Sequence, residues 1–198
     1  MMIVQQRQGI SFQERLALYR RVEHVIAQAL RQRYSVIVTG DLPGGNHHGP
    51  RLSGNGKQIT VADLHVYGKR KGWIEIKTKG KPWKYEKYNR LEHGIDLVKW
   101  EHYWRLQQTT GLTVYLMVIE EDSGAVLMRD LDSIQASRDV HTGEWPPPDC
   151  RPSINFDRCS LAKVGSVNWK IQRAHLDFDV LDSFLSQLAL FDSEELRS

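Results

Sequence analysis

The sequence predicts a mixed α/β domain, and three observations lead to this prediction. A helical pattern of apolar residues begins after Ser11. Short runs of β-branched and apolar residues then follow between positions 34 and 79, as expected for strands. A second helical pattern, with Asp96 as its predicted N-cap and Gly111 as its end, leads into a nearly continuous apolar run over 112–120, which is typical of a strand buried on both faces. With 198 residues, the chain is long enough for one domain with a substantial core.

The first helix is predicted from its capping residues and its periodicity. Ser11 is placed to N-cap it, with Glu14 at the capping-box position. The apolar residues that recur at helical spacing are Leu16, Tyr19, Val22, Ile26, Ala29 and Leu30. Glu23 lies on the same helix, about three turns before Tyr34. At this point Glu23 is open to two interpretations, an exposed helix acid or a functional acid.

The strand region is predicted to consist of one strand, a long loop and a hairpin. Residues 34–39 form the first core strand, and 40–57, rich in glycine, form the loop. That loop carries His47 and His48, for which an exposed pair or a phosphate contact is favoured over a zinc site. Residues 59–67 are expected to form a strand with Asp63 at its middle, and the turn 68–72 joins it to the strand 73–79.

The strand 73–79 carries an acid and a lysine two residues apart. Because side chains alternate across a strand, Glu75 and Lys77 point to one face, and Ile74 and Ile76 point to the other. An antiparallel hairpin brings Asp63 beside Glu75, with about 5 Å between cross-strand neighbours. Two carboxylates that close repel each other unless a cation lies between them. Hard oxygen ligands without a thiolate favour Mg²⁺ or Mn²⁺, and a solvated salt-bridged face is the alternative.

The spacing of Asp63 and of Glu75-Ile76-Lys77 resembles the PD-(D/E)XK nuclease superfamily, which includes restriction endonucleases and archaeal Holliday-junction resolvases. The resemblance covers roughly residues 14–130. It implies a restriction-endonuclease-like core of a helix, a three-strand meander, a helix and a strand. The short motif is weakly specific, and the order of the surrounding elements adds to it. One departure is visible, because Ala62 stands where the family often has a proline.

The resemblance also implies roles for individual residues. Asp63, Glu75 and the backbone carbonyl of Ile76 would hold Mg²⁺ or Mn²⁺, and Lys77 would position the attacking water or neutralise the phosphate. Glu23 occupies the place of a helix glutamate that completes the metal site in resolvase-like members. On the later helix, Tyr103 or Gln107 would be the polar residue that such members place near the site. The implied activity is hydrolysis of phosphodiester bonds in nucleic acid, with DNA favoured and an endonuclease expected.

Charge is distributed unevenly along a chain whose formal net charge is only +3. From Lys57 to Arg105 there are twelve Lys or Arg against six Asp or Glu, whereas residues 176–198 hold six acids and one Arg. A cation-rich region around a metal site suits a polyanionic partner. Within it, aromatic and cationic residues alternate over 80–90, as in surfaces that contact nucleic acid, and the alternative is a loop whose aromatic residues pack onto the domain. The candidate contact residues are Lys79, Lys81, Lys84, Tyr85, Lys87 and Arg90.

The remaining third of the chain is expected to extend the core, which spans about 11–130, within a single domain over 1–198. A short helix over 131–136, a loop over 144–152, one or two strands within 154–175 and an amphipathic helix over 178–190 are predicted for this C-terminal extension of 131–198.

Several classes of protein are disfavoured by composition. No apolar run approaches the length of a membrane span, and the N-terminus has no secretory pattern. Cys150 and Cys159 are too few for a disulfide scaffold, so a cytoplasmic protein that does not engage a membrane is expected. Three functional alternatives stay open: a nucleic-acid-binding module that does not cleave, a partner-binding protein with an ordinary salt-bridged face, and a structure-specific junction resolvase, which would require a homodimer.

Overall fold

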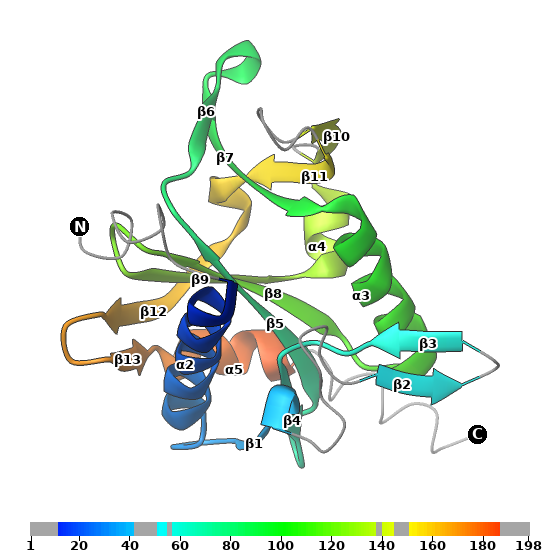
Figure 1. Ribbon diagram of the computed structural model, residues 1–198, viewed down its shortest axis with the longest axis vertical. Coiled ribbons are helices and arrows are strands. Elements are labelled where there is room, and N and C mark those ends of the chain that lie inside the picture. Colours follow the sequence, from blue (N-terminus) through cyan, green and yellow to red (C-terminus); the bar gives the residue numbers. More distant parts are fainter. Residues whose placement is uncertain (1–11, 42–50, 55–56, 138–139, 145–150, 187–198) are drawn as a thin grey trace.

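The computed structural model describes residues 12–41, 51–54, 57–137, 140–144 and 151–186. At its centre is a seven-stranded mixed sheet (Figure 1). All neighbouring strands run antiparallel except β5 and β8, which are parallel. In spatial order the strands are β1 (Ser35–Val38), β4 (Leu64–Tyr67), β5 (Gly72–Lys79), β8 (Val114–Glu120), β9 (Ala125–Asp130), β12 (Ala162–Asn168) and β13 (Arg173–Leu176).

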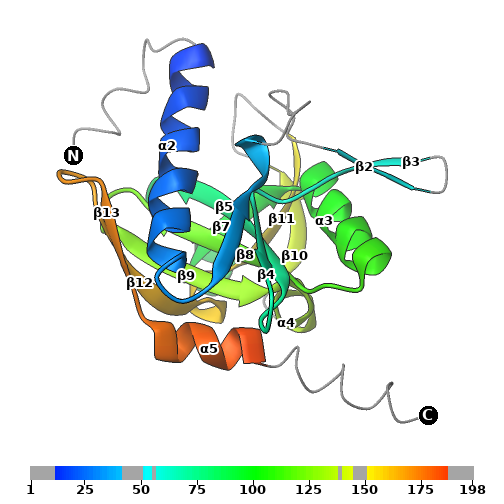
Figure 2. The same ribbon diagram turned by 90° about the horizontal axis from the view of Figure 1, so that it is seen from below.

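Helices cover both faces of this sheet (Figures 1 and 2). On one face lie α2 (Phe12–Leu30) and α5 (Phe178–Ser186). On the other lie α3 (Leu97–Thr110) and α4 (Leu131–Ala136), together with a second sheet. Its strands are, in spatial order, β10 (His141–Glu144), β11 (Pro152–Asp157), β7 (Arg90–Asp96) and β6 (Trp83–Tyr85). A separate hairpin consists of β2 (Arg51–Gly54) and β3 (Lys57–Thr60).

The central strand β8 separates two hydrophobic cores. Its residues Tyr115, Met117 and Ile119 belong to the core beneath α2 and α5. The alternate residues belong to the core beneath α3, and they are Val114, Leu116 and Val118. All seven residues of β8 are buried, which confirms the prediction drawn from the continuous apolar run 112–120.

The mixed α/β class is confirmed, and so are most of the predicted elements. The hairpin across 68–72, the helix that ends at Gly111 and the short helix 131–136 are all present. Gly111 adopts the left-handed conformation, with φ of 66°, that a helix C-cap commonly requires. The strands predicted within 154–175 are β11, β12 and β13, with a turn over 169–172 where part of a strand was expected. None of the helices in the described part of the chain has the length and hydropathy needed to cross a bilayer.

Four local predictions are wrong. Residues 59–67 are two strands rather than one, because Thr39 engages the backbone at 62–63 and the chain leaves the β2–β3 hairpin there. The predicted loop 40–57 contains β2. The loop expected around 80–90 is instead the β6–β7 hairpin. Asp96 stands at the N-cap of α3, but its side chain accepts a 2.8 Å hydrogen bond from Arg151 and does not cap the helix.

Some predictions fall outside the described residues. These concern Ser11, the pair His47 and His48, Cys150, the side chain of Glu14 and the part of the last helix beyond Ser186. Of the loop predicted over 144–152, Glu144 instead ends β10 and Pro152 begins β11, and residues 145–150 lie outside the described part of the chain.

Candidate active site

Asp63 lies in the short connection between β3 and β4, and Thr39 fixes its backbone. The Thr39 hydroxyl is 2.7 Å from the carbonyl oxygen of Ala62 and 3.0 Å from that of Asp63. The Thr39 N–H also donates to the Asp63 carbonyl at 2.9 Å. Ala62 is fully buried beneath this contact. The connection is therefore held to the end of β1, and the Asp63 side chain extends from a fixed backbone.

The Asp63 carboxylate is directed at the middle of β5. Its Oδ2 accepts a 2.8 Å hydrogen bond from the backbone N–H of Ile76. Since Leu64 pairs with Ile74, one further step in this antiparallel register sets Asp63 opposite Glu75, as the sequence predicted. The N–H and C=O groups of one strand residue point to the same side. The Ile76 carbonyl therefore opens toward the side of the strand on which Asp63 lies.

Glu75 and Lys77 point to one face of β5, and Ile74 and Ile76 are part of the core on the other. Glu75 is only 3% exposed, and the Lys77 ammonium donates to its Oε1. Tyr103 closes the group from α3. Its ring centroid is 5.8 Å from Lys77 Nζ, and its buried hydroxyl hydrogen-bonds with Glu75.

Asp63, Glu75 and Lys77 form a cluster, called here the acid–lysine group, whose electrostatics are dominated by burial and by repulsion between the acids. Burial, followed by repulsion from Glu75, raises the pKa of Asp63 well above its usual range. The same two causes raise the pKa of Glu23 to about 7. Burial alone would lower the pKa of Lys77, but the attraction of Glu75 and Asp63 outweighs it, so this pKa is raised. Lys77 is thus charged at neutral pH, and its charge acts on both Asp63 and Glu75.

The donor set fits a hard divalent cation. A carboxylate whose pKa is raised by a neighbouring carboxylate, as that of Asp63 is by Glu75, is stabilised by positive charge between the two. Asp63, Glu75 and the Ile76 carbonyl all offer oxygen donors. Mg²⁺ typically takes only one or two protein carboxylates and keeps several waters. Within the described residues, no group of three or more His, Cys, Asp or Glu side chains could hold a metal on its own.

Glu23 reaches the same neighbourhood from α2. The pKa of its carboxyl responds to both Glu75 and Lys77, and its Oε2 would lie 3.7 Å from a Cβ at Gly40. The structure thus brings Glu23 into electrostatic contact with the acid–lysine group and adjacent to the 3₁₀ turn Thr39–Asp41. A direct role in metal binding remains a prediction.

The two candidate polar residues of α3 lie in different surroundings. Tyr103 lies in the site. Gln107 is used elsewhere, because its amide donates to Asp132 at 2.8 Å and its Oε1 accepts from the backbone of Val114 at 2.9 Å. Sequence reasoning missed Thr39, which orients Asp63. A threonine that directly follows a buried strand is the only signal that could have drawn attention to it.

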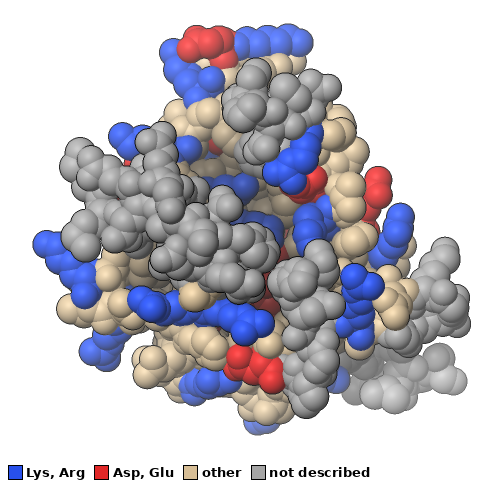
Figure 3. All heavy atoms as spheres, viewed as in Figure 1, with Lys and Arg blue, Asp and Glu red and all other residues tan. Residues whose placement is uncertain are grey.

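The candidate nucleic-acid contacts separate into two groups. Lys81, Lys84 and Lys87 are exposed, whereas Lys79 is half-buried at the end of β5. Arg90 and Tyr85 make internal contacts: Arg90 Nε donates to Glu92 at 2.7 Å, and the Tyr85 ring stacks on His141 at 4.9 Å. Lys and Arg side chains gather over the β6–β7 hairpin at the top of Figure 3.

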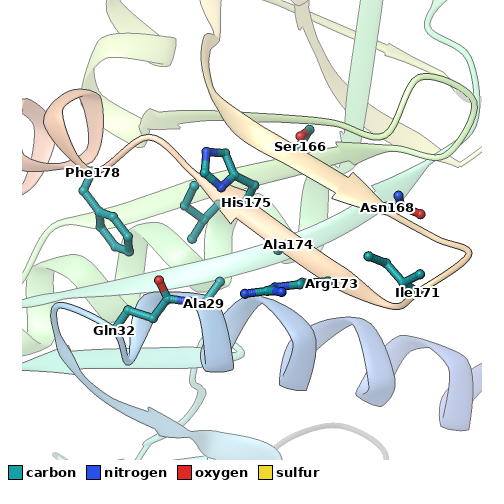
Figure 4. Close-up of a pocket in the computed structure, with 10 residues that line it drawn as sticks. Ala29, Gln32, Ser166, Asn168, Ile171, Arg173, Ala174, His175 and Phe178 are labelled. Carbon is teal, nitrogen blue, oxygen red and sulfur yellow. The ribbon is translucent and has the colours of Figure 1, made fainter.

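A cavity of about 490 Å³ lies apart from the acids, between α2 and the β12–β13 hairpin (Figure 4). Gln32, Arg173 and His175 contribute polar groups to its wall, and Ile171 and Phe178 contribute apolar surface. None of Glu23, Asp63, Glu75 or Lys77 lines it. The cavity therefore contributes nothing to the acid–lysine site.

Comparison with known proteins does not assign this chain to a family. No protein-family model matches the chain, and no characterised protein is similar enough in sequence to count as a relative. Among solved structures, the Holliday junction resolvase Hjc of the archaeal hyperthermophile Archaeoglobus fulgidus is similar, with a TM-score of 0.43 and 11% sequence identity. The match covers 73% of this chain and 89% of that one. So low a similarity establishes neither the fold nor the activity of this chain.

Proposed function

We propose that this protein is a nuclease that depends on a divalent metal and hydrolyses phosphodiester bonds in DNA. The observation that carries the proposal is the group formed by Asp63, Glu75 and Lys77, in which Asp63 is hydrogen-bonded to the backbone between the other two. Two acids and a lysine of this kind, gathered where β4 and β5 diverge, match the arrangement that the PD-(D/E)XK resemblance implies. The element order α2, β1, β4, β5, α3, β8 also matches the implied core, with the β2–β3 and β6–β7 hairpins inserted.

The proposed roles follow from the charges. Asp63, Glu75 and the Ile76 carbonyl would hold Mg²⁺ or Mn²⁺. When bound, that ion would polarise the phosphate and lower the pKa of a coordinated water. Lys77 donates to Glu75 in the structure, and beside a substrate its ammonium is placed to orient a water or to offset phosphate charge. Tyr103 donates to Glu75 and limits the positions that the carboxylate can take.

Burial of the proposed site would strengthen its electrostatic interactions with a substrate. Glu75 and Tyr103 are almost completely buried, so water competes little with the charges there. Electrostatic interactions are stronger in such a setting than at an open surface. A phosphodiester carries a negative charge that increases in the transition state, and fixed cations that meet it are worth several kcal/mol.

The test is a cleavage assay on duplex, single-stranded, flapped and four-way substrates with Mg²⁺, Mn²⁺ or EDTA. We expect cleavage that requires a divalent ion and disappears in an Asp63→Asn variant. Binding without cleavage under all of these conditions would instead indicate a non-catalytic nucleic-acid-binding module. Absence of binding at low salt would indicate that the acids and Lys77 form an ordinary salt-bridged face.

A further inference from the structure

The β6–β7 hairpin projects from the body of the protein directly after the strand that carries Glu75 and Lys77 (Figure 1). Only residues 80–82 separate the end of β5 from the start of β6. The hairpin, called here the β6–β7 arm, comprises residues 83–96 and includes a 3₁₀ turn at Glu86–Tyr88.

One side of the arm is fixed to the body. Arg90 Nη2 lies 3.3 Å from Nδ1 of His141 in β10, and the Tyr85 ring stacks on the same histidine. At the base of the arm, Glu92 is fully buried and pairs with Asp157 of β11. These contacts involve both strands of the ribbon. The arm is therefore a braced element, and its position relative to β5 is set by packing.

The other side of the arm faces solvent. Lys84 and Leu91 are cross-strand neighbours on it, and Leu91 is 46% exposed. At the tip, Tyr88 is 54% exposed, with the Lys87 ammonium 5.1 Å from its ring centroid. Lys84 lies 3.6 Å from Glu86, but both are exposed, and such pairs contribute little. The outward side thus combines cations, one aromatic ring and one aliphatic side chain.

We propose that the β6–β7 arm lies in the major groove of duplex DNA beside the cleavage site. This proposal rests on the proposed nuclease function, and it specifies the substrate as duplex that continues past the cut. The major groove of B-DNA admits a two-stranded β-ribbon. The distal part of the arm has this form, because residues 90 and 91 of β7 pair with β6 and lie beyond the last β7–β11 pair, Glu92 with Asp157. Lys84 and Lys87 meet phosphates along the groove edges, and Leu91 meets the base edges, where an apolar side chain contacts thymine methyl groups.

The length of the arm limits how far from the scissile phosphate its tip can contact the DNA. Lys87 follows Lys77 by ten positions, and a fully extended chain of that length spans at most about 35 Å. That distance equals about one helical turn of duplex DNA. The tip therefore contacts DNA within about one turn of the scissile phosphate, on the side toward which the arm projects.

The experiment measures binding to 12- and 30-bp duplexes and to a 30-nucleotide single strand by fluorescence anisotropy, with Ca²⁺ in place of Mg²⁺ to keep the DNA intact. The test variants are Lys84→Ala with Lys87→Ala, and Leu91→Glu. The matched control for the lysines is Lys163→Ala with Lys170→Ala, which removes two exposed cations near the β12–β13 edge of the seven-stranded sheet. The matched control for Leu91→Glu is Ile171→Glu, which adds an acid at a residue that is 66% exposed.

We expect the double lysine variant to lower the salt slope of 30-bp binding by about 2, because each phosphate contact contributes about 0.9. Leu91→Glu should weaken 30-bp binding by about 5- to 100-fold, the range of one groove contact. Both controls should bind like the wild type, and the preference of the wild type for 30 bp over 12 bp should shrink in the arm variants.

Normal 30-bp binding by the arm variants would overturn the proposal, and so would a loss confined to the single strand. Cleavage separates the two proposals. If the wild type cleaves duplex with Mg²⁺ and the arm variants bind normally, only the arm proposal fails. If the wild type binds duplex through the arm and never cleaves it, only the nuclease function fails.

Discussion

The backbone N–H of Ile76, in the middle of β5, donates a 2.8 Å hydrogen bond to Oδ2 of Asp63, the residue directly before β4. This bond fixes the Asp63 carboxylate beside Glu75, despite repulsion between the two acids. It occupies one oxygen of Asp63. This one hydrogen bond thus fixes the proposed metal ligand Asp63 relative to strand β5.

The first prediction separates the charge of Asp63 from its hydrogen bond. Asp63→Asn removes the charge, and its amide oxygen can still accept from Ile76, so the metal-free protein should be as stable as the wild type or more stable. Asp63→Ala also removes the acceptor and should cost about 1–3 kcal/mol of unfolding free energy. Neither variant should cleave DNA. Urea unfolding with EDTA and a cleavage assay test this, and an active Asp63→Asn variant would contradict the proposed mechanism.

The second prediction concerns Lys77, whose ammonium donates to Glu75. A protonated lysine cannot ligate a metal, so Lys77→Ala should retain metal binding and most DNA affinity. Cleavage should fall by about 10²–10⁴-fold, the usual loss when a group that positions or activates water is removed. Lys77→Arg keeps the charge without the compact ammonium and should rescue poorly. Single-turnover cleavage at saturating Mg²⁺, with calorimetric titration of the metal, provides the measurement.

If Lys77→Ala cleaves at the wild-type rate, the ion pair with Glu75 serves only to compensate a buried charge. A useful control is Lys71→Ala, on the exposed turn that precedes β5. It removes the same type of charge from a position outside the site and should leave the cleavage rate unchanged.

Local sequence patterns predicted the parts of the site that lie on one strand. The alternation of Ile74, Glu75, Ile76 and Lys77 determines which side chains share a face, because strand periodicity needs no tertiary information. The position of Asp63 was predicted through the hairpin register, although the strand around it was not. Its break depends on Thr39, which is 24 residues away and contacts it only in the folded chain. No local pattern encodes such a contact.

The β6–β7 arm illustrates the same limit. Its alternating aromatic and cationic residues suggested a loop that contacts nucleic acid. Which of them face solvent depends on partners distant in sequence, such as His141 beneath Tyr85. Arg90 was therefore predicted as a contact residue, whereas in the structure it pairs with buried Glu92. Tyr88 and Leu91, which the sequence did not single out, are exposed beside Lys84 and Lys87.

The third prediction tests Tyr103 against a matched tyrosine. Tyr103 and Tyr115 are both 2% exposed, and their hydroxyls make hydrogen bonds on opposite faces of the sheet. Tyr103→Phe removes the bond to Glu75, and Tyr115→Phe removes the bond to the Phe184 carbonyl. Each should cost about 1 kcal/mol of unfolding free energy. Only Tyr103→Phe should slow cleavage, because only its hydroxyl restrains a proposed metal ligand.

Thermal or urea unfolding shows whether the two variants are equally stable, and single-turnover cleavage shows whether they differ in rate. The Mg²⁺ concentration that gives half-maximal cleavage should rise for Tyr103→Phe alone. An equal loss of rate in both variants would mean that Tyr103 acts through general stability of the cores.

The fourth prediction concerns pH and Glu23. Burial and the nearby Glu75 raise the pKa of Glu23 from 4.5 to about 7. A carboxyl whose pKa is higher in the folded state binds protons more tightly there, so it favours folding at low pH. That contribution is complete below about pH 4.5, the ordinary pKa, and is lost as the pH rises through about 7. The metal-free protein should therefore lose stability between these values, and Glu23→Gln should flatten the loss.

The measurement is Tm against pH from 4.5 to 8 with EDTA, repeated with Mg²⁺. Asp63 has a raised pKa too, so Glu23→Gln should reduce the slope without abolishing it. The control Glu101→Gln neutralises an exposed helix acid and should leave the slope intact. Mg²⁺ should flatten the wild-type curve, because a bound cation stabilises ionised acids and lowers their pKa values. A Glu23→Gln slope equal to that of the wild type would mean that Glu23 ionises as freely as an ordinary surface acid and lies outside the electrostatic reach of Glu75.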